Sequence, residues 1–99
     1  MIQIVAKHFV KPEHVESYLK LAGKLVAKTR QLDAGCIQYA LFQDLKDSSI
    51  LTIIEQWESQ DALDQHMAAA HFKEMVPKLG EFCEKPGEIN LYRPVEAEQ

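Results

Sequence analysis

The feature that most restricts the fold is a pair of neighbouring stretches, residues 36–43 (CIQYALFQ) and 49–57 (SILTIIEQW). The polar residues 44–48 between them are typical of a hairpin turn. Successive side chains of a strand point to opposite faces, so neighbours such as Ile53 and Ile54 face in opposite directions. Both faces of each stretch are therefore apolar, whereas a sheet with one face in water is polar on that face. The pair predicts the centre of a sheet that is covered on both sides.

A strand and a long helix are predicted before this pair. Residues 2–10 (IQIVAKHFV) are rich in β-branched residues and contain no glycine or proline, which is typical of a strand. Pro12 suits the first position of a helix, and apolar residues then recur every three to four positions as far as Leu32. Gly35 lies just beyond the expected end of this helix, where a residue with positive φ is commonly needed. The spacing predicts a helix of about five turns.

A second helical region and a last strand follow the pair. Ser59 can cap the start of the helical region, which has an apolar side. Pro77 lies inside this region and is expected to kink or split it. Pro86 and Gly87 then break the chain before a last strand at residues 88–93. The order of the elements is therefore βαββαβ.

The order βαββαβ indicates an α+β protein with the ferredoxin-like fold, in which an antiparallel sheet carries its helices on one face. Helices on one face leave the apolar residues of the other face uncovered, and such a surface marks an interaction site. A second copy of the chain, packed face to face as a homodimer, covers it most simply. The alternative is a monomer whose sheet is polar on one face. We expect one domain over residues 1–95 and a short acidic tail at 96–99.

Charge and hydropathy exclude several classes of partner. The net charge of −4 and the scattered lysines and arginines leave no basic stripe, so nucleic acid is not an expected partner. No apolar run approaches the roughly 18 residues of a membrane span, and the first residues do not resemble a secretion signal. We therefore expect a cytoplasmic protein. Cys36 and Cys83 match no metal-binding or redox spacing and are expected to be buried thiols.

An acid, an indole and an imidazole are predicted to lie near one another. Glu55 and Trp57 are two residues apart and share one face of the third strand. His66 follows Leu63 by three residues and precedes Ala70 by four, so it points inward with them. A lone inward histidine is most often a hydrogen-bonded core residue, and a single tryptophan is most often core packing. Both structural interpretations stand beside the functional one.

Short motifs on the third strand, the second helical region and the last strand extend this pattern. They are Glu55-x-Trp57-x-Ser59, Ala62-Leu63-x-x-His66, His71-Phe72-Lys73 and Gly87-Glu88-Ile89 to Tyr92. Together they resemble the central signature and the closing strand of the antibiotic biosynthesis monooxygenase family, over nearly the whole chain. The resemblance implies a dimeric α+β barrel. It does not fix the chemistry, because this family includes cofactor-free oxygenases of quinols and anthrones, haem-degrading enzymes, a sugar-phosphate isomerase and members without a known substrate.

Haem degradation and an intrinsic metal site can be weighed residue by residue. Haem-degrading members bring a histidine ligand, a tryptophan and an asparagine to the haem, and here Val76 and His8 stand where the histidine and asparagine are expected. Haem degradation is therefore disfavoured, although Trp57 is present. No metal site is expected either, because His66 and His71 are five residues apart and would face different sides of one continuous helix.

The resemblance favours a cofactor-independent monooxygenase that oxidises a small, electron-rich, quinol-like aromatic with molecular oxygen. No cofactor is expected, which suits a sequence without GxGxxG or a phosphate-binding loop. His66 is the first candidate for the base that deprotonates the substrate, because an imidazole titrates near pH ~6.5. His71 and His8 are the second choices, and either can instead have a structural role, as a helix cap or at an exposed strand end. 

Three further residues are assigned supporting roles. Glu55 is expected to orient or tune the imidazole, or simply to pair with a lysine or cap a helix. Trp57 is expected to form an aromatic wall for the substrate ring, and Tyr39 to offer a hydroxyl group unless it belongs to the dimer face.

Two other functions remain open. The first is an isomerase of a small phosphorylated carbohydrate, which would use the same acid and histidine for proton transfer. The second is a non-catalytic protein that binds a small molecule, as in a stress response. Ligand binding without product would distinguish it from the enzymes.

Overall fold

The computed structural model describes residues 1–96, so all but the first residue of the predicted tail at 96–99 lies outside the described residues. The fold is α+β and ferredoxin-like, as predicted. Ser59 caps the second helix as expected, because its Oγ accepts a hydrogen bond from the backbone N–H of Ala62 at 3.1 Å. The elements are β1 (Ile2–Val10), a 3-10 turn (Pro12–His14), α1 (Val15–Leu32), β2 (Cys36–Gln43), β3 (Ile50–Trp57), α2 (Gln60–Ala68), α3 (Ala70–Glu81) and β4 (Cys83–Tyr92).

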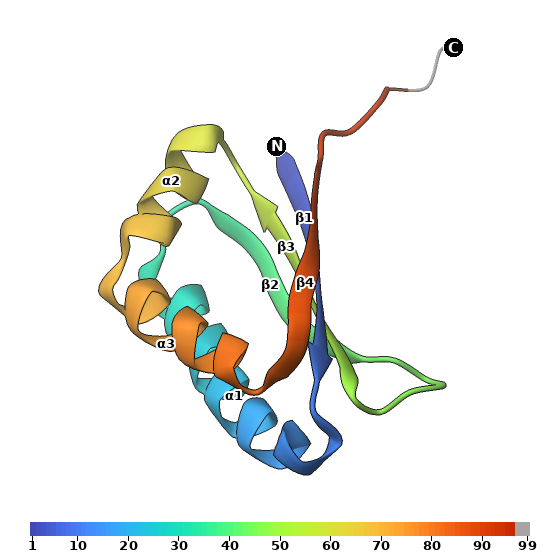
Figure 1. Ribbon diagram of the computed structural model, residues 1–99. Coiled ribbons are helices and arrows are strands. Elements are labelled where there is room, and N and C mark those ends of the chain that lie inside the picture. Colours follow the sequence, from blue (N-terminus) through green and yellow to red (C-terminus); the bar gives the residue numbers. More distant parts are fainter. Residues whose placement is uncertain (97–99) are drawn as a thin grey trace.

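One antiparallel sheet with the strand order β2-β3-β1-β4 carries all the helices on one side (Figure 1). We call the side that faces the helices the inner face and the opposite side the outer face. Alternation along β3 sends every second residue, from Leu51 to Trp57, to the inner face, where they are buried. α1 closes the core with Tyr18, Ala22, Leu25 and Thr29, which are spaced three to four residues apart and fully buried.

The outer face is not covered by any element of residues 1–96 (Figure 1). Register places Ala40 beside Ile54 and Phe42 beside Thr52 on this face. Phe42 is 47% exposed. Gln3 and Gln56, which also pair on this face, make it mixed rather than uniformly apolar. The homodimer that would cover this face stays a prediction.

The second helical region divides at Ala69, so the prediction that Pro77 divides it is wrong. Ala69 has an extended backbone, with φ −68° and ψ 147°, while α3 continues through Pro77. Alanine is the best helix former, so local propensity does not explain the break. The break is explained by the histidine side chains before and after Ala69, because both form hydrogen bonds with one carboxylate that follows α1, as described below. 

The last strand begins earlier than predicted. β4 starts at Cys83 and passes through Pro86 and Gly87, which were expected to precede it. β4 is an edge strand, where a proline removes no hydrogen bond that the sheet needs. The register against β1 also shifts between Lys7 and Phe9, so Pro86 and Gly87 occupy an irregularity of the ladder.

Two further expectations concern the thiols and the membrane. Cys36 and Cys83 are free and partly buried. Within residues 1–96, no helix combines the length and the apolar character that crossing a bilayer requires.

Candidate active site

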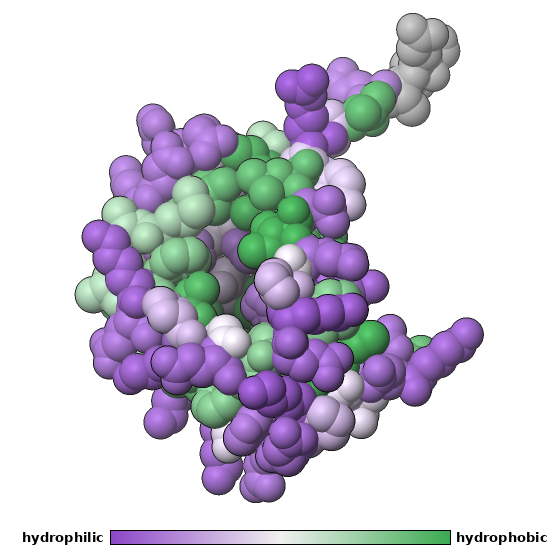
Figure 2. Space-filling model, in the orientation of Figure 1, coloured by the Kyte–Doolittle hydropathy of each residue, from purple (hydrophilic) through white to green (hydrophobic). Residues whose placement is uncertain are grey.

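A cavity of about 190 Å³ lies between the inner face of the sheet and the helices. It opens between the helices and β4, where Figure 2 shows a hollow ringed by apolar residues. Ile89 and Leu91 of β4 and Met67 of α2 line it and are also exposed, so they form its mouth. The polar side chains among the lining residues are His8, Tyr39, Glu55, Gln60 and His66.

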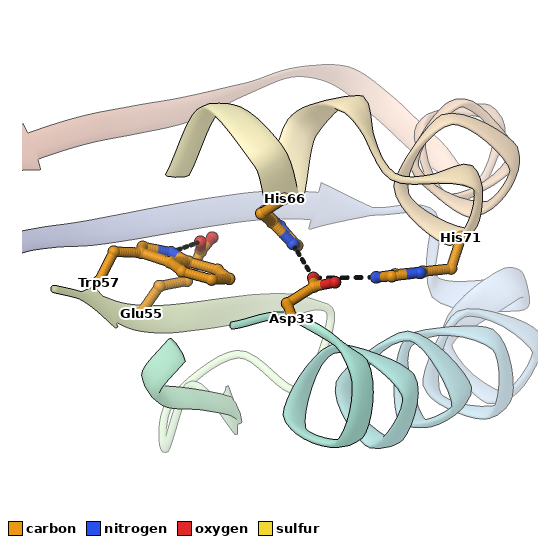
Figure 3. Close-up of polar contacts among 5 residues, drawn as sticks. All are labelled: Asp33, Glu55, Trp57, His66 and His71. Carbon is orange, nitrogen blue, oxygen red and sulfur yellow. Dashed lines mark hydrogen bonds and ion pairs between the residues drawn. The ribbon is translucent and has the colours of Figure 1, made fainter. Parts of the chain in front are cut away.

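Asp33 holds two histidines, of which His66 lines this cavity (Figure 3). Its Oδ2 atom lies 2.6 Å from Nδ1 of His66 and 2.9 Å from Nε2 of His71. The three side chains are nearly buried, with 7% exposure for Asp33, 1% for His66 and 8% for His71. A carboxylate accepts hydrogen bonds, so both ring nitrogens carry the hydrogen in these contacts. 

The end of α1 places Asp33 in the cluster. Asp33 is the first non-helical residue after α1, and its N–H still donates to the carbonyl of Thr29 at 3.0 Å. Gly35 then turns the chain with φ 81°. A Cβ atom on Gly35 would lie 2.5 Å from the Cβ of Ala62, so this turn packs directly against α2. Only glycine permits both the positive φ and the close approach, which bring Asp33 beneath the histidine of α2.

The break at Ala69 brings His71 to the same carboxylate. His66 lies near the end of α2 and His71 near the start of α3, on helices with different directions. The expectation that these histidines face different sides of one continuous helix is therefore wrong. Their ring centroids are 6.3 Å apart.

Within residues 1–96, the second ring nitrogen of His66 has no hydrogen-bond partner. Nδ1 donates to Asp33, so in the neutral ring Nε2 carries the lone pair, and this atom is buried without a hydrogen bond from the described residues. His66 lines the cavity. Burial lowers the pKa of His66 below its usual value, and the hydrogen bond and charge of Asp33 oppose this only in part. The site thus presents a neutral imidazole with a free acceptor nitrogen.

Glu55 makes a different contact from the one predicted. Its Oε1 accepts a hydrogen bond from the indole Nε1 of Trp57 at 2.8 Å, and the structure gives it no bond to His66 (Figure 3). Asp33 orients the imidazole instead. Burial raises the pKa of Glu55 to about 7, although the bond from the indole lowers it. Glu55 lines the cavity as a carboxyl group that is partly protonated near neutral pH.

Aromatic rings pack around His66. The ring of Trp57 lies 4.5 Å from the imidazole at 32°, and the ring of Tyr39 lies 5.2 Å away, edge to face. Tyr39 lines the cavity, but Trp57, which is fully buried, does not. The indole therefore backs the imidazole rather than forming the cavity wall that the sequence suggested.

His8 lies elsewhere on the cavity wall. It shares the inner face with Ile4 and Ala6, which also line the cavity. Its Nδ1 forms a hydrogen bond with the hydroxyl group of Tyr18 on α1, and burial lowers its pKa. Glu55 pairs with Ile4 and His8 with Leu51, so these two polar groups are four residues, or about 13 Å, apart along the sheet. The cavity has a polar group near each end.

Four of the predicted residues line the cavity, namely His66, Glu55, Tyr39 and His8. The other two, His71 and Trp57, do not line it. Asp33 was missed. An acid at the carboxyl end of a helix is unfavourable to the helix dipole. That position was a signal that Asp33 serves another purpose.

Sequence comparison gives a family. A model of the family described as "Antibiotic biosynthesis monooxygenase" matches residues 1–78. "Putative monooxygenase YcnE" of Bacillus subtilis is 33% identical over 89 residues, which cover 90% of this chain and 93% of that protein. "Uncharacterized protein sll1783" of Synechocystis is 30% identical over 90% of this chain, which spans only 60% of that longer protein.

Solved structures agree with the sequence comparison. A crystal structure of a conserved protein from Methanosarcina mazei is 43% identical, with a TM-score of 0.89 over 93% of this chain and 90% of that one. A crystal structure named as an antibiotic biosynthesis monooxygenase is 38% identical, with a TM-score of 0.92 over 97% of this chain and 100% of that one. The family and these names support a monooxygenase-like function. The chain belongs to the antibiotic biosynthesis monooxygenase family.

Proposed function

We propose that this protein is a cofactor-independent monooxygenase that oxidises a small, electron-rich, quinol-like aromatic with molecular oxygen. The observation that carries the proposal is Nε2 of His66, a buried acceptor without a hydrogen-bond partner in residues 1–96. It belongs to a residue that lines a largely apolar cavity and whose ring is fixed through Nδ1 by Asp33. This is the arrangement of a general base.

Such a reaction balances without an added reductant. The substrate gives up two hydrogen atoms and receives one oxygen atom in their place, while the second oxygen atom leaves as water. The substrate therefore supplies all four electrons that reduce the oxygen molecule. What the protein must provide is deprotonation, because the anion of a quinol is a much better electron donor than the neutral molecule.

His66 takes the substrate proton on Nε2 and becomes an imidazolium ion. Asp33, 2.6 Å from Nδ1, stabilises that charge without accepting the proton. The lining of the cavity is largely apolar, so a bound aromatic would displace water from it and strengthen the attraction between the imidazolium and the substrate anion. Glu55 in its protonated form, the hydroxyl group of Tyr39 and His8 offer hydrogen bonds to substrate oxygens.

The cavity gives less support to the other two functions. A sugar phosphate needs positive charge, and none of the residues that line this cavity is a lysine or an arginine. A non-catalytic binding protein would not need the free acceptor of His66, which costs energy when it is buried without a partner.

We also propose that the protein is a homodimer joined through the outer face of the sheet. Its apolar residues Ala40, Phe42 and Ile54 are adjacent in the register and are covered by no helix of residues 1–96. A partner sheet is the simplest cover for them.

Oxygen uptake tests the enzymatic proposal. Purified, chelator-treated protein is given a panel of hydroquinones in an oxygen electrode, with a blank that measures autoxidation. His66→Ala removes the base, and His14→Ala, which changes a histidine that does not line the cavity, is the matched control. We expect wild type and His14→Ala to exceed the blank, and His66→Ala to fall by about 10²-fold or more.

Equal uptake by wild type and the blank for every quinol would remove the proposal. Tight quinol binding in the same samples, without product, would then favour the binding protein. If His66→Ala keeps the wild-type rate, the oxidation is real but His66 is not its base.

A further inference from the structure

We propose that Asp33, His66 and His71 form a binding site for a divalent transition-metal ion of the Zn²⁺ class, and that the bound ion reverses the tautomer of His66. The first half stands on the geometry of the cluster alone. The consequence of the second half rests on the proposed function. If His66 is the base of the oxidation, a His66 that carries its hydrogen on Nε2 cannot accept the substrate proton.

The donor atoms are those that such ions prefer. One carboxylate oxygen and two imidazole nitrogens, from three different elements, lie within 4.8 Å of one another. Two histidines and one carboxylate are a frequent protein ligand set for Zn²⁺ when a water completes the coordination. Ions at the Cu²⁺ and Zn²⁺ end of the divalent series bind such sites most strongly.

Both ring nitrogens are already aimed at one point. Nδ1 of His66 and Nε2 of His71 both direct a hydrogen at Oδ2 of Asp33, from 2.6 and 2.9 Å. A metal ion replaces these two hydrogens. Ligand atoms around a tetrahedral ion with bonds of about 2.0 Å are about 3.3 Å apart, so the carboxylate oxygen must move away from the two nitrogens by roughly 0.4 to 0.7 Å. Asp33 lies outside the helical part of α1, with ψ 109°, where such a shift breaks no helical turn.

The negative charge of the Asp33 carboxylate also favours the binding of a cation. Asp33 is 7% exposed, and its only ion-pair partners within residues 1–96 are the two histidines. Neither a lysine nor an arginine of this part of the chain pairs with it. A buried carboxylate is normally paired with a cation or bound to a metal. A divalent ion supplies the missing positive charge.

The ligating ring is held rigidly. Trp57 and Phe72 pack against His66, with ring centroids 4.5 and 5.0 Å away. Such packing fixes the direction of Nδ1 before an ion arrives, which lowers the cost of ordering the site.

Metal binding changes Nε2 of His66 from a hydrogen-bond acceptor to a donor. Without the ion, Nδ1 carries the hydrogen and Nε2 is an acceptor. With Nδ1 bound to the ion, a neutral imidazole carries its hydrogen on Nε2, which becomes a donor. The ion therefore removes the acceptor that takes the substrate proton, and it does so from behind the cavity, without entering it.

Direct binding of Co²⁺ and Zn²⁺ to the chelator-treated protein tests the site. We expect one ion per chain by calorimetry, and the intense visible absorption of four- or five-coordinate Co²⁺. His71→Gln keeps a side-chain donor for Asp33 but removes one ligand, and should weaken binding by about 100-fold. His14→Ala removes a histidine outside the cluster and should bind as wild type does.

Long-range ¹H–¹⁵N spectra of the histidine rings test the tautomer without any assay of activity. His66 should show the hydrogen on Nδ1 before Zn²⁺ is added and on Nε2 afterwards. Where quinol oxidation is measurable, Zn²⁺ should abolish it in wild type, and His71→Gln should need about 100-fold more Zn²⁺ for the same fractional loss of its own metal-free rate.

Three results would overturn the proposal: weak, pale octahedral Co²⁺ absorption, equal affinity in wild type and His71→Gln, or an unchanged His66 tautomer with Zn²⁺ bound. If the ion binds and the tautomer changes while no quinol is ever oxidised, the metal site stands and the proposed enzymatic function fails.

Discussion

The indole of Trp57 donates a hydrogen bond to the carboxyl group of Glu55, two residues earlier on the same face of β3, at 2.8 Å. Both residues are buried: Trp57 is fully buried, and 7% of the surface of Glu55 is exposed. The bond gives the carboxylate one partner but does not offset its burial, since the pKa of Glu55 still rises to about 7. The core thus contains an acid whose charge is costly at neutral pH.

Glu55→Gln should stabilise the protein more at high pH than at low pH. The folded state holds the Glu55 proton up to a pH near 7, and the unfolded state loses it near 4.5. Between pH 5 and pH 8.5, ionisation of this group therefore lowers the free energy of unfolding of wild type by about 2 to 3 kcal/mol. The glutamine variant does not show this decrease. Urea denaturation of both proteins at the two pH values measures the difference. The same difference in unfolding free energy at both would contradict the raised pKa.

Gly35→Ala should destabilise the protein by about 2 to 4 kcal/mol. The new Cβ would meet Ala62 at 2.5 Å, and φ is 81°, so overpacking and backbone strain add. Gly23→Ala is the matched control, because outside the neighbouring backbone of α1 no described residue has an atom within 4 Å of its Cβ position. It should stabilise by about 0.5 to 1 kcal/mol. Denaturant titration of both variants checks the prediction, and a neutral Gly35→Ala would count against the close contact with α2.

Asp33→Asn should change the pH profile of quinol oxidation as well as its rate. His66 acts as a base in its neutral form, so the rate rises through the pKa of His66, which burial places below about 6.5. The charge of Asp33 raises this pKa, and its loss should move the acidic limb to lower pH and reduce kcat about 10²-fold. Asp33 is a positioning residue in this scheme. A lower rate with an unmoved limb would indicate a structural role only.

Ile54→Lys should convert a dimer into a monomer of 11.3 kDa. Ile54 lies at the centre of the outer face beside Ala40, where a buried lysine would be very costly. Leu45→Lys, in the exposed hairpin turn, is the control and should leave the dimer intact. Sedimentation of the three proteins measures the mass. A wild type that is monomeric at every concentration would refute this prediction.

Hydropathy patterns predicted most of the fold because they report burial. The alternation in β3 and the spacing in α1 both follow from contact with one core, so the order of elements and the ferredoxin-like fold were accessible. The start of β4 was not, because Pro86 is a breaker in a central strand and harmless in an edge strand. Sequence does not show which strand is the edge.

The candidate site was only partly accessible for a similar reason. His66 and Glu55 are marked by their positions within periodic elements, and both line the cavity. Asp33 precedes His66 by 33 residues, and no local pattern joins them. The approach of His71 depends on an extended Ala69 between two other alanines, where propensity predicts continuous helix.

That extended alanine makes the segment 60–81 a place where local and tertiary preferences disagree. Excised as a peptide, the segment would lack Asp33, which holds its two imidazoles together, and would lose the contacts that favour the extended conformation of Ala69. The bend is a property of the whole molecule. Because the carboxylate that holds the two imidazoles follows α1, the bend is stabilised only once α1 and this segment have packed together.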